Sequence, residues 1–224
     1  GRDLSSCFCY MAGMSRFAIL LGGDLVVTPR LRRQIAGARI IAADSGMKHA
    51  SALGLVPELW VVDFDSSGSE LLLDYALVPR QTHSADKDAT DGEIAVTEAL
   101  RLGATEIVLI GGLGGESDHA TAHLGLALHL ARSGQKCFIS NGDEEAYPLI
   151  AGTYEFDFGP QSRFSIVPWS DITGLNLTGV KWPLKDKALT LGTSFTMSNV
   201  ALEPVKLSFS SGIAIAIAYP TQTD

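Results

Sequence analysis

The sequence predicts an α/β protein in two parts: a Rossmann-like domain with a mostly parallel sheet, then a small antiparallel β-sandwich-like domain. The first observation is that short apolar, β-branched runs alternate with helical stretches from Phe17 to about Gly142, which is typical of βαβ units. The second is that this alternation stops after Asn141, where short strand-like segments and turns take over. We therefore place the α/β domain at residues 14–145 and the β domain at residues 146–224.

The elements of the α/β domain are expected in the following order. A strand over residues 17–21 ends at Gly22-Gly23-Asp24. A helix begins near Pro29, because proline suits the first helical turn, and ends at Gly37. The same signals predict further strands over residues 40–43, 58–62, 105–110 and 136–140, and helices over residues 46–53, 67–76, 90–102 and 117–132.

The β domain is expected from alternating patterns. Apolar and polar side chains alternate along residues 154–158 and 163–167, which are bounded by Gly159-Pro160 and Pro168. Residues 213–217 carry a branched side chain at every second position. In a strand this period places the branched side chains on one face, so these segments predict antiparallel strands around a core.

Four acidic clusters stand where strands should end. In open α/β sheets, ligands bind outside the carboxyl ends of the strands. Carboxylates gathered there would repel one another unless a cation lay among them, and a divalent cation carrying phosphate oxygens meets that need. The pattern indicates a magnesium-dependent phosphoryl-type transferase. The clusters are Asp44-Ser45-Gly46, Asp63-Phe64-Asp65-Ser66, residues 86–93 and residues 111–119.

The alternative for each cluster is a helix cap or a solvated turn, since Asp and Ser are favoured at helix N-termini. For any one cluster alone this alternative is the better one. Four clusters at successive strand ends are harder to explain by capping. Asp63 and Asp65 add a further argument, because alternate residues of a strand face the same side and suit paired metal ligands.

The glycine run from Gly111 to Gly115 precedes a helix, where backbone N–H groups can approach phosphate. The chain has no Gly-x-x-x-x-Gly-Lys-Ser/Thr motif, which excludes a P-loop kinase. His119 and His123 are four residues apart on one helix face, but they lack a metalloprotease motif, so a structural role is the better interpretation.

The charge, the cysteines and the apolar runs of the chain limit the classes of partner and the compartment to be expected. The net charge of −8 argues against a nucleic-acid partner. Three cysteines, Cys7, Cys9 and Cys137, fit a reducing, cytoplasmic compartment. No apolar run is long enough to span a membrane. Residues 1–13 do not have the pattern of a secretion signal and are expected to be a disordered leader or a cloning remnant.

Taken in order, these motifs resemble the thiamin pyrophosphokinase family. The resemblance holds over most of residues 17–145, with a weaker continuation at residues 178–184 and 192–199. The matching residues are Gly22-Gly23-Asp24, Ala43-Asp44-Ser45-Gly46, Asp63-Phe64-Asp65-Ser66, residues 87–95, Gly111-Gly112-Leu113-Gly114-Gly115 and Asp118-His119.

The resemblance implies a homodimer that transfers a diphosphate group from ATP to the hydroxyl of thiamin, giving thiamin diphosphate and AMP. It implies that magnesium is held by Asp44, Asp63, Asp65 and Asp91, and that Asp65, Lys87 and Asp91 act in catalysis. Asp91 is also the candidate to accept the proton of the thiamin hydroxyl. Ser198 and Asn199 would belong to a thiamin pocket across the dimer interface. The nucleotide would contact Asp44, Ser45, Asp88, Thr90, Gly111, Gly112, Gly114, Gly115 and Asp118.

Two residues depart from the family pattern. Val62 stands where the family usually has Gly, and Glu116 where it usually has Arg. An acid near a triphosphate adds repulsion, unless Glu116 faces solvent and caps the following helix. Two alternatives stay open: a related diphosphotransferase with another donor or acceptor, and a binding protein without turnover on the same scaffold.

Overall fold

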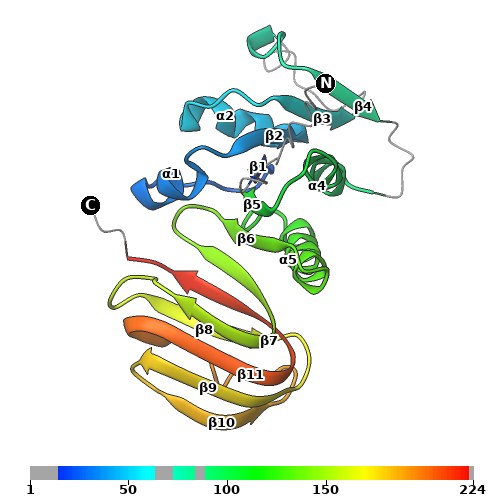
Figure 1. The fold of residues 1–224 in the computed structure, drawn as a ribbon. Coiled ribbons are helices and arrows are strands. Elements are labelled where there is room, and N and C mark those ends of the chain that lie inside the picture. Colours follow the sequence, from blue (N-terminus) through cyan, green and yellow to red (C-terminus); the bar gives the residue numbers. More distant parts are fainter. Residues whose placement is uncertain (1–14, 64–72, 84–88, 222–224) are drawn as a thin grey trace, which may run out of the picture.

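The computed structural model describes residues 15–63, 73–83 and 89–221 (Figure 1). Within these ranges the strands form one 11-stranded sheet in the order β10-β9-β11-β7-β6-β5-β1-β2-β3-β4, with β8 paired to β11. The predicted fold class is confirmed: the N-terminal strands are parallel and covered by helices, and the C-terminal strands are antiparallel. No helix in the described ranges is long and apolar enough to cross a membrane.

The parallel half holds six strands within the described residues. They are β1 (Arg16–Leu20), β2 (Arg39–Ala43), β3 (Leu59–Asp63), β4 (Arg80–His83), β5 (Glu106–Ile110) and β6 (Lys136–Ser140). β1 lies between β2 and β5, so later strands are added first on one side of β1 and then on the other. The order therefore reverses between β1 and β5, and in open α/β sheets ligands bind at such a switch point.

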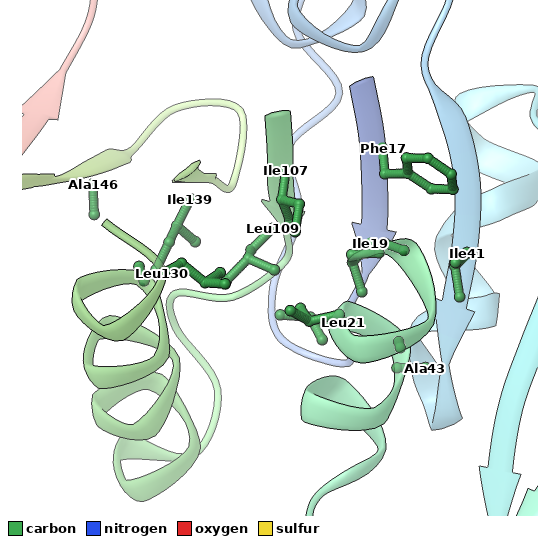
Figure 2. Close-up of a cluster of buried hydrophobic side chains, with 14 of the residues drawn as sticks. Phe17, Ile19, Leu21, Ile41, Ala43, Ile107, Leu109, Leu130, Ile139 and Ala146 are labelled. Carbon is green, nitrogen blue, oxygen red and sulfur yellow. The ribbon is translucent and has the colours of Figure 1, made fainter. Parts of the chain in front are cut away.

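Helices cover both faces of this half. They are α1 (Pro29–Ile35), the 3₁₀ turn η1 (Asp44–Met47), α2 (Lys48–Leu53), α4 (Asp91–Arg101) and α5 (Ser117–Arg132). Alternation along β1 sends Phe17 and Ile19 into the core on the α4 and α5 side (Figure 2). Ala18 and Leu20 face the opposite core, with Leu31 of α1. All four residues of the apolar run from Phe17 to Leu20 are therefore buried, as a strand covered on both faces requires.

The antiparallel half forms the second domain. Its strands are β7 (Glu145–Phe156), β8 (Arg163–Pro168), β9 (Ile172–Val180), β10 (Leu184–Leu189) and β11 (Asn199–Tyr219). β11 is long enough to pair with β7 over much of its length, and also with β8 and β9 in different stretches. Their inner faces enclose a separate core that includes Phe158, Phe164 and Leu207.

The two halves are joined at β6 and β7, which pair antiparallel through Ile139–Ala146 and Ser140–Glu145. Glu145 has no exposed surface. Arg30 of α1 makes two bonds to its carboxylate, Nε–Oε1 at 2.6 Å and Nη2–Oε2 at 3.0 Å. Gln34 and Tyr147 each donate one more at 2.6 Å. The domain boundary near residue 145 stays a prediction, since the sheet continues across it without a break.

Several element predictions can be compared with the structure. The predicted helix over residues 117–132 and strand over residues 136–140 agree with α5 and β6. The helix predicted over residues 46–53 is instead a 3₁₀ turn from Asp44 followed by α2. β4 was not predicted, because Arg80-Gln81-Thr82-His83 has no apolar alternation. Most of the helix predicted over residues 67–76 lies outside the described residues.

Candidate active site

A cavity of about 550 Å³ opens at the carboxyl ends of β1, β2 and β5, where the strand order reverses. The first turns of α4 and α5 and the residues before them complete its wall. Three of the four acidic clusters, distant in sequence, therefore meet around one space. The lining residues are Leu21, Gly22, Gly23, Ala43, Asp44, Ser45, Ala89, Thr90, Asp91, Gly92, Gly111, Gly114, Gly115, Glu116, His119 and His123.

Glycines after β1 and β5 form part of the cavity wall. The Gly23 amide donates to the Gly111 carbonyl over 3.0 Å, which continues the pairing of the two strands beyond their ends. A Cβ at Gly23 would lie 2.5 Å from that carbonyl oxygen. Gly111 has φ of +70°, which favours glycine. Only a chain without side chains can run this close, so this wall consists of backbone.

Asp44 has an uncommon backbone conformation at the end of β2. Its φ is +45°, in the left-handed region that few residues other than glycine adopt. The indole Nε1 of Trp60 donates to its carbonyl over 3.0 Å and helps to hold it. Gly46 follows so closely under Leu20 that a Cβ would lie 2.1 Å from the Leu20 oxygen. Such conformations occur where the surrounding structure fixes a functional side chain.

Thr90 and Asp91 reach the cavity through the N-terminus of α4. Thr90 caps this helix: its hydroxyl accepts from the Glu93 amide at 3.3 Å, and the Glu93 carboxylate accepts from the Thr90 amide at 2.9 Å. This capping box fixes the first turn. The amide groups of that turn carry partial positive charge that favours a bound anion. Asp91, at the first helical position, adds a carboxylate beside them.

Two histidines contact the glycine segments and were not predicted as site residues. His49 Nε2 is 2.9 Å from the Gly23 carbonyl, and His123 Nδ1 is 3.0 Å from the Gly112 carbonyl. Burial lowers the pKa of both imidazoles from the ordinary value of 6.5. A carbonyl can only accept a hydrogen bond, so the facing nitrogen of each neutral imidazole carries the proton. In His123, which lines the cavity, Nε2 therefore keeps its lone pair. The i, i+4 spacing with His119 gave no hint of this role.

Glu116 lies at the edge of the cavity at the N-cap of α5. Its side chain is 80% exposed, and a carboxylate oxygen lies 3.5 Å from His119 Nε2. The alternative of a solvent-facing helix cap is therefore met only in part: the side chain is exposed, but it makes no capping hydrogen bond.

The other predicted site residues of the α/β domain either do not line this cavity or lie outside the described residues. Gly112 is buried, and Asp118 lines an adjoining hollow of about 250 Å³ together with Thr90 and His119. Asp63 ends β3, but its side chain is not described, and Asp65, Lys87 and Asp88 lie outside the described residues.

Ser198 and Asn199 are in the β domain and do not line the cavity. Ser198 is exposed and has φ of +59°. Asn199 is buried and exchanges two hydrogen bonds with the backbone of Trp182, at 3.2 and 2.9 Å. Its amide therefore fixes the segment that presents Trp182.

The two halves of the chain match two family models. The model of the thiamin pyrophosphokinase catalytic domain matches residues 35–139, and that of the thiamin pyrophosphokinase vitamin B1 binding domain matches residues 154–214. A curated relative, the thiamine pyrophosphokinase of Bacillus subtilis (strain 168), is 29% identical over 182 residues, or 79% of this chain and 85% of the relative.

Solved structures agree in fold over nearly the whole chain. The thiamine pyrophosphokinase crystal structure from Bacillus subtilis has a TM-score of 0.82 at 26% identity, covering 92% of this chain and 99% of that one. The thiamin pyrophosphokinase from Geobacillus thermodenitrificans has a TM-score of 0.78 at 27% identity, covering 93% and 99%. Both domains, in this order, are thus shared, and the chain belongs to the thiamin pyrophosphokinase family.

Proposed function

We infer that this protein transfers a diphosphate group from ATP to the hydroxyl of thiamin, giving thiamin diphosphate and AMP. The observation that carries this proposal is the meeting of Asp44, Asp91 and the glycine loop (residues 111–115) around one cavity. Phosphoryl-type transfer requires mainly positioning and stabilisation of negative charge. Backbone amides and carboxylate-bound cations supply both, and family membership supplies the substrates.

The triphosphate is proposed to lie against the glycine loop and the first turn of α4. Both line the cavity: the loop does so with backbone that carries no side chains, and α4 with its first turn and the positive end of its dipole. The absence of side chains at Gly111, Gly114 and Gly115 lets a phosphate approach the backbone closely. Ser45 is a further polar contact at the end of β2.

Magnesium is proposed to be held by Asp44 and Asp91, which supply carboxylate oxygens from two different elements of the cavity. Oxygen donors of this kind are those that Mg²⁺ prefers, so the residues present fit the ion. A bound ion would offset the charge that develops on the transferred group. Asp63 and Asp65 are proposed as further ligands, Lys87 as a cation for the same charge, and Asp88 as part of its loop. Asp91 is also the proposed proton acceptor for the thiamin hydroxyl.

Thiamin is proposed to bind between the cavity of one subunit and the β domain of its partner in a homodimer. Ser198 and Asn199 would contribute from the β domain. Three exposed apolar side chains support a binding or subunit surface there: Trp182 at 52%, Phe195 at 63% and Met197 at 49%. Trp182 is bonded to Asn199, and Met197 precedes Ser198 in the chain. The cytoplasmic location stays a prediction.

Glu116 favours the second candidate, a protein that binds its ligands without efficient turnover. Its carboxylate at the edge of the cavity would repel a triphosphate. An assay of AMP release with thiamin, Mg²⁺ and a panel of nucleotides separates the candidates. Thiamin-dependent AMP formation from ATP supports the proposal. Activity only with another donor or acceptor, or tight binding without turnover, would replace it with one of the alternatives.

A further inference from the structure

The side chain of Asn141 is hydrogen-bonded to the backbone of the glycine loop. The Leu113 amide donates to Asn141 Oδ1 over 3.0 Å, and Asn141 Nδ2 donates to the Leu113 carbonyl. The Asn141 side-chain amide therefore bonds both the N–H and the C=O of Leu113. A neighbouring strand would pair with backbone groups in a similar way. Asn141 is only 6% exposed and does not line the cavity.

A second contact holds the outer part of the loop. The Gly115 amide donates to Asp24 Oδ2 over 3.2 Å. Gly114, with φ of +72°, allows this approach, since a Cβ there would lie 2.9 Å from the same oxygen. Asp24 and Asn141 come from the turns that follow β1 and β6. The loop after β5 is thus bonded to the turns after both neighbouring strands.

The composition of the loop explains why such contacts are needed. Gly111, Gly114 and Gly115 all have φ between 68° and 72°. Glycine has many accessible conformations, so fixing several in a row costs more backbone entropy than fixing other residues. Leu113 is the one loop residue whose side chain packs in the core, so the glycines obtain their shape from hydrogen bonds to the loop backbone.

The backbone of Asn141 is itself held by hydrogen bonds to other segments. Its amide donates to the Glu144 carbonyl at 2.9 Å, and its carbonyl accepts from the Val26 amide at 2.8 Å. The preceding Ser140 hydroxyl donates to Gln34 Oε1 at 3.2 Å, and Gln34 donates in turn to the buried Glu145. The junction of the two domains therefore supports the residue that shapes the loop.

We propose that Asn141 is a positioning residue that acts through Leu113 to set the nucleotide-binding shape of the glycine loop, and that Asp24 does the same through Gly115. This inference rests on the proposed function, since it assumes that the loop receives the phosphates of ATP. Neither residue needs to touch the nucleotide for its loss to weaken binding.

The test measures the affinity of a non-hydrolysable ATP analogue by calorimetry, in the presence of Mg²⁺ and without thiamin. Asn141→Ala removes both bonds to Leu113, and we expect it to weaken binding about tenfold, close to 1.4 kcal/mol. In the AMP-release assay the KM for ATP should rise by a similar factor, with the KM for thiamin changed less than twofold.

Tyr154→Phe is the matched control for lost hydrogen bonds. The Tyr154 hydroxyl also bonds both backbone groups of one residue, Ile150, at 2.9 and 2.8 Å, but within the β domain. Its removal should lower the Tm and leave nucleotide affinity unchanged. Equal weakening of nucleotide binding in Tyr154→Phe and Asn141→Ala would mean that Asn141 acts only through general stability.

Asp24 supplies a second test that does not depend on Asn141→Ala folding, since Asp24 is exposed. Asp24→Asn keeps an oxygen for the Gly115 amide, whereas Asp24→Ala does not. Both lose the charge, so weaker binding in Asp24→Ala than in Asp24→Asn supports the positioning role, and equal binding contradicts it. A wild type that binds no nucleotide overturns the proposed function together with this inference. A nucleotide-binding wild type with unchanged variants overturns the inference alone.

Discussion

The Gly23 amide donates to the Gly111 carbonyl over 3.0 Å, so the chain segments that leave β1 and β5 stay paired at the wall of the cavity. These are the two strands between which the order of the sheet reverses. At this point the chain segments that follow the two strands lead to opposite faces of the sheet, which leaves a crevice between them. The bond limits how far the two segments can separate.

Replacing Gly23 by alanine tests this pairing. The added Cβ would lie 2.5 Å from the Gly111 oxygen and 2.8 Å from the Leu113 oxygen, both fixed backbone atoms. We expect Gly23→Ala to lower the Tm and to reduce kcat/KM for ATP more than tenfold. Gly125→Ala is the control, because its Cβ would meet nothing within 4 Å. Alanine inside helix α5 should stabilise the protein by about 0.5–1 kcal/mol. Equal activity of the two variants would contradict the account.

The charge at Glu116 should influence ATP more than thiamin. Its exposed carboxylate lies at the edge of the cavity, so Glu116→Arg replaces repulsion of the triphosphate with attraction. We expect the KM for ATP to fall several-fold, with little change for thiamin. Glu116→Gln, which only removes the charge, should give a smaller decrease. Unchanged ATP kinetics in both variants would place Glu116 outside the field of the phosphates.

The buried ion pair at the domain junction should be far more important for stability than an exposed pair of similar geometry. Glu145 is fully buried and bonded twice by Arg30, whereas Glu58 is bonded twice by Arg39 at the surface. Removing one charge of a buried pair leaves the other uncompensated, at a cost of about 3–5 kcal/mol. We expect about that loss in Glu145→Gln and less than about 1 kcal/mol in Glu58→Gln. Urea unfolding of both variants measures the difference, and equal losses would contradict the argument.

Stability should decrease when the pH falls below the ordinary histidine pKa of 6.5. Burial lowers the pKa of His49 and His123 in the folded protein, so the unfolded chain binds protons first. Their contribution is complete above pH 6.5 and is lost as the pH falls through the folded values. Thermal melts between pH 8 and pH 5 should therefore show a smaller decrease in Tm for His123→Gln than for the wild type. Parallel curves would show that His123 does not contribute.

The sequence could predict the parts of this molecule that depend on local pattern. α5 and β6 have clear apolar periodicity and a glycine stop at Gly134, and both were predicted with their observed bounds. The rule that ligands bind at the carboxyl ends of the strands also predicted that Asp44, Asp91 and the glycine loop would gather at one site, although they are far apart in sequence.

Features that depend on distant partners could not be predicted. β4 is a strand only because Arg80-Gln81-Thr82-His83 pairs with β3. Asn141 bonds to Leu113 across 28 residues, and its sequence context, Ser-Asn-Gly, is that of an ordinary turn. The role of His123 depends on the carbonyl of Gly112 and on burial under the loop. Each of these features depends on a contact with a segment distant in the sequence, so the local sequence does not reveal it.

Incubation with thiamin, Mg²⁺ and ATP labelled at the β-phosphate, followed by identification of the labelled product, tests whether this protein transfers a diphosphate group. If the cavity at β1 and β5 serves diphosphate transfer, the label should appear in thiamin diphosphate, with one AMP formed per molecule. Asp91→Asn should reduce both products together while leaving the Tm nearly unchanged. Formation of ADP with thiamin monophosphate, or AMP release that does not depend on thiamin, would contradict the account.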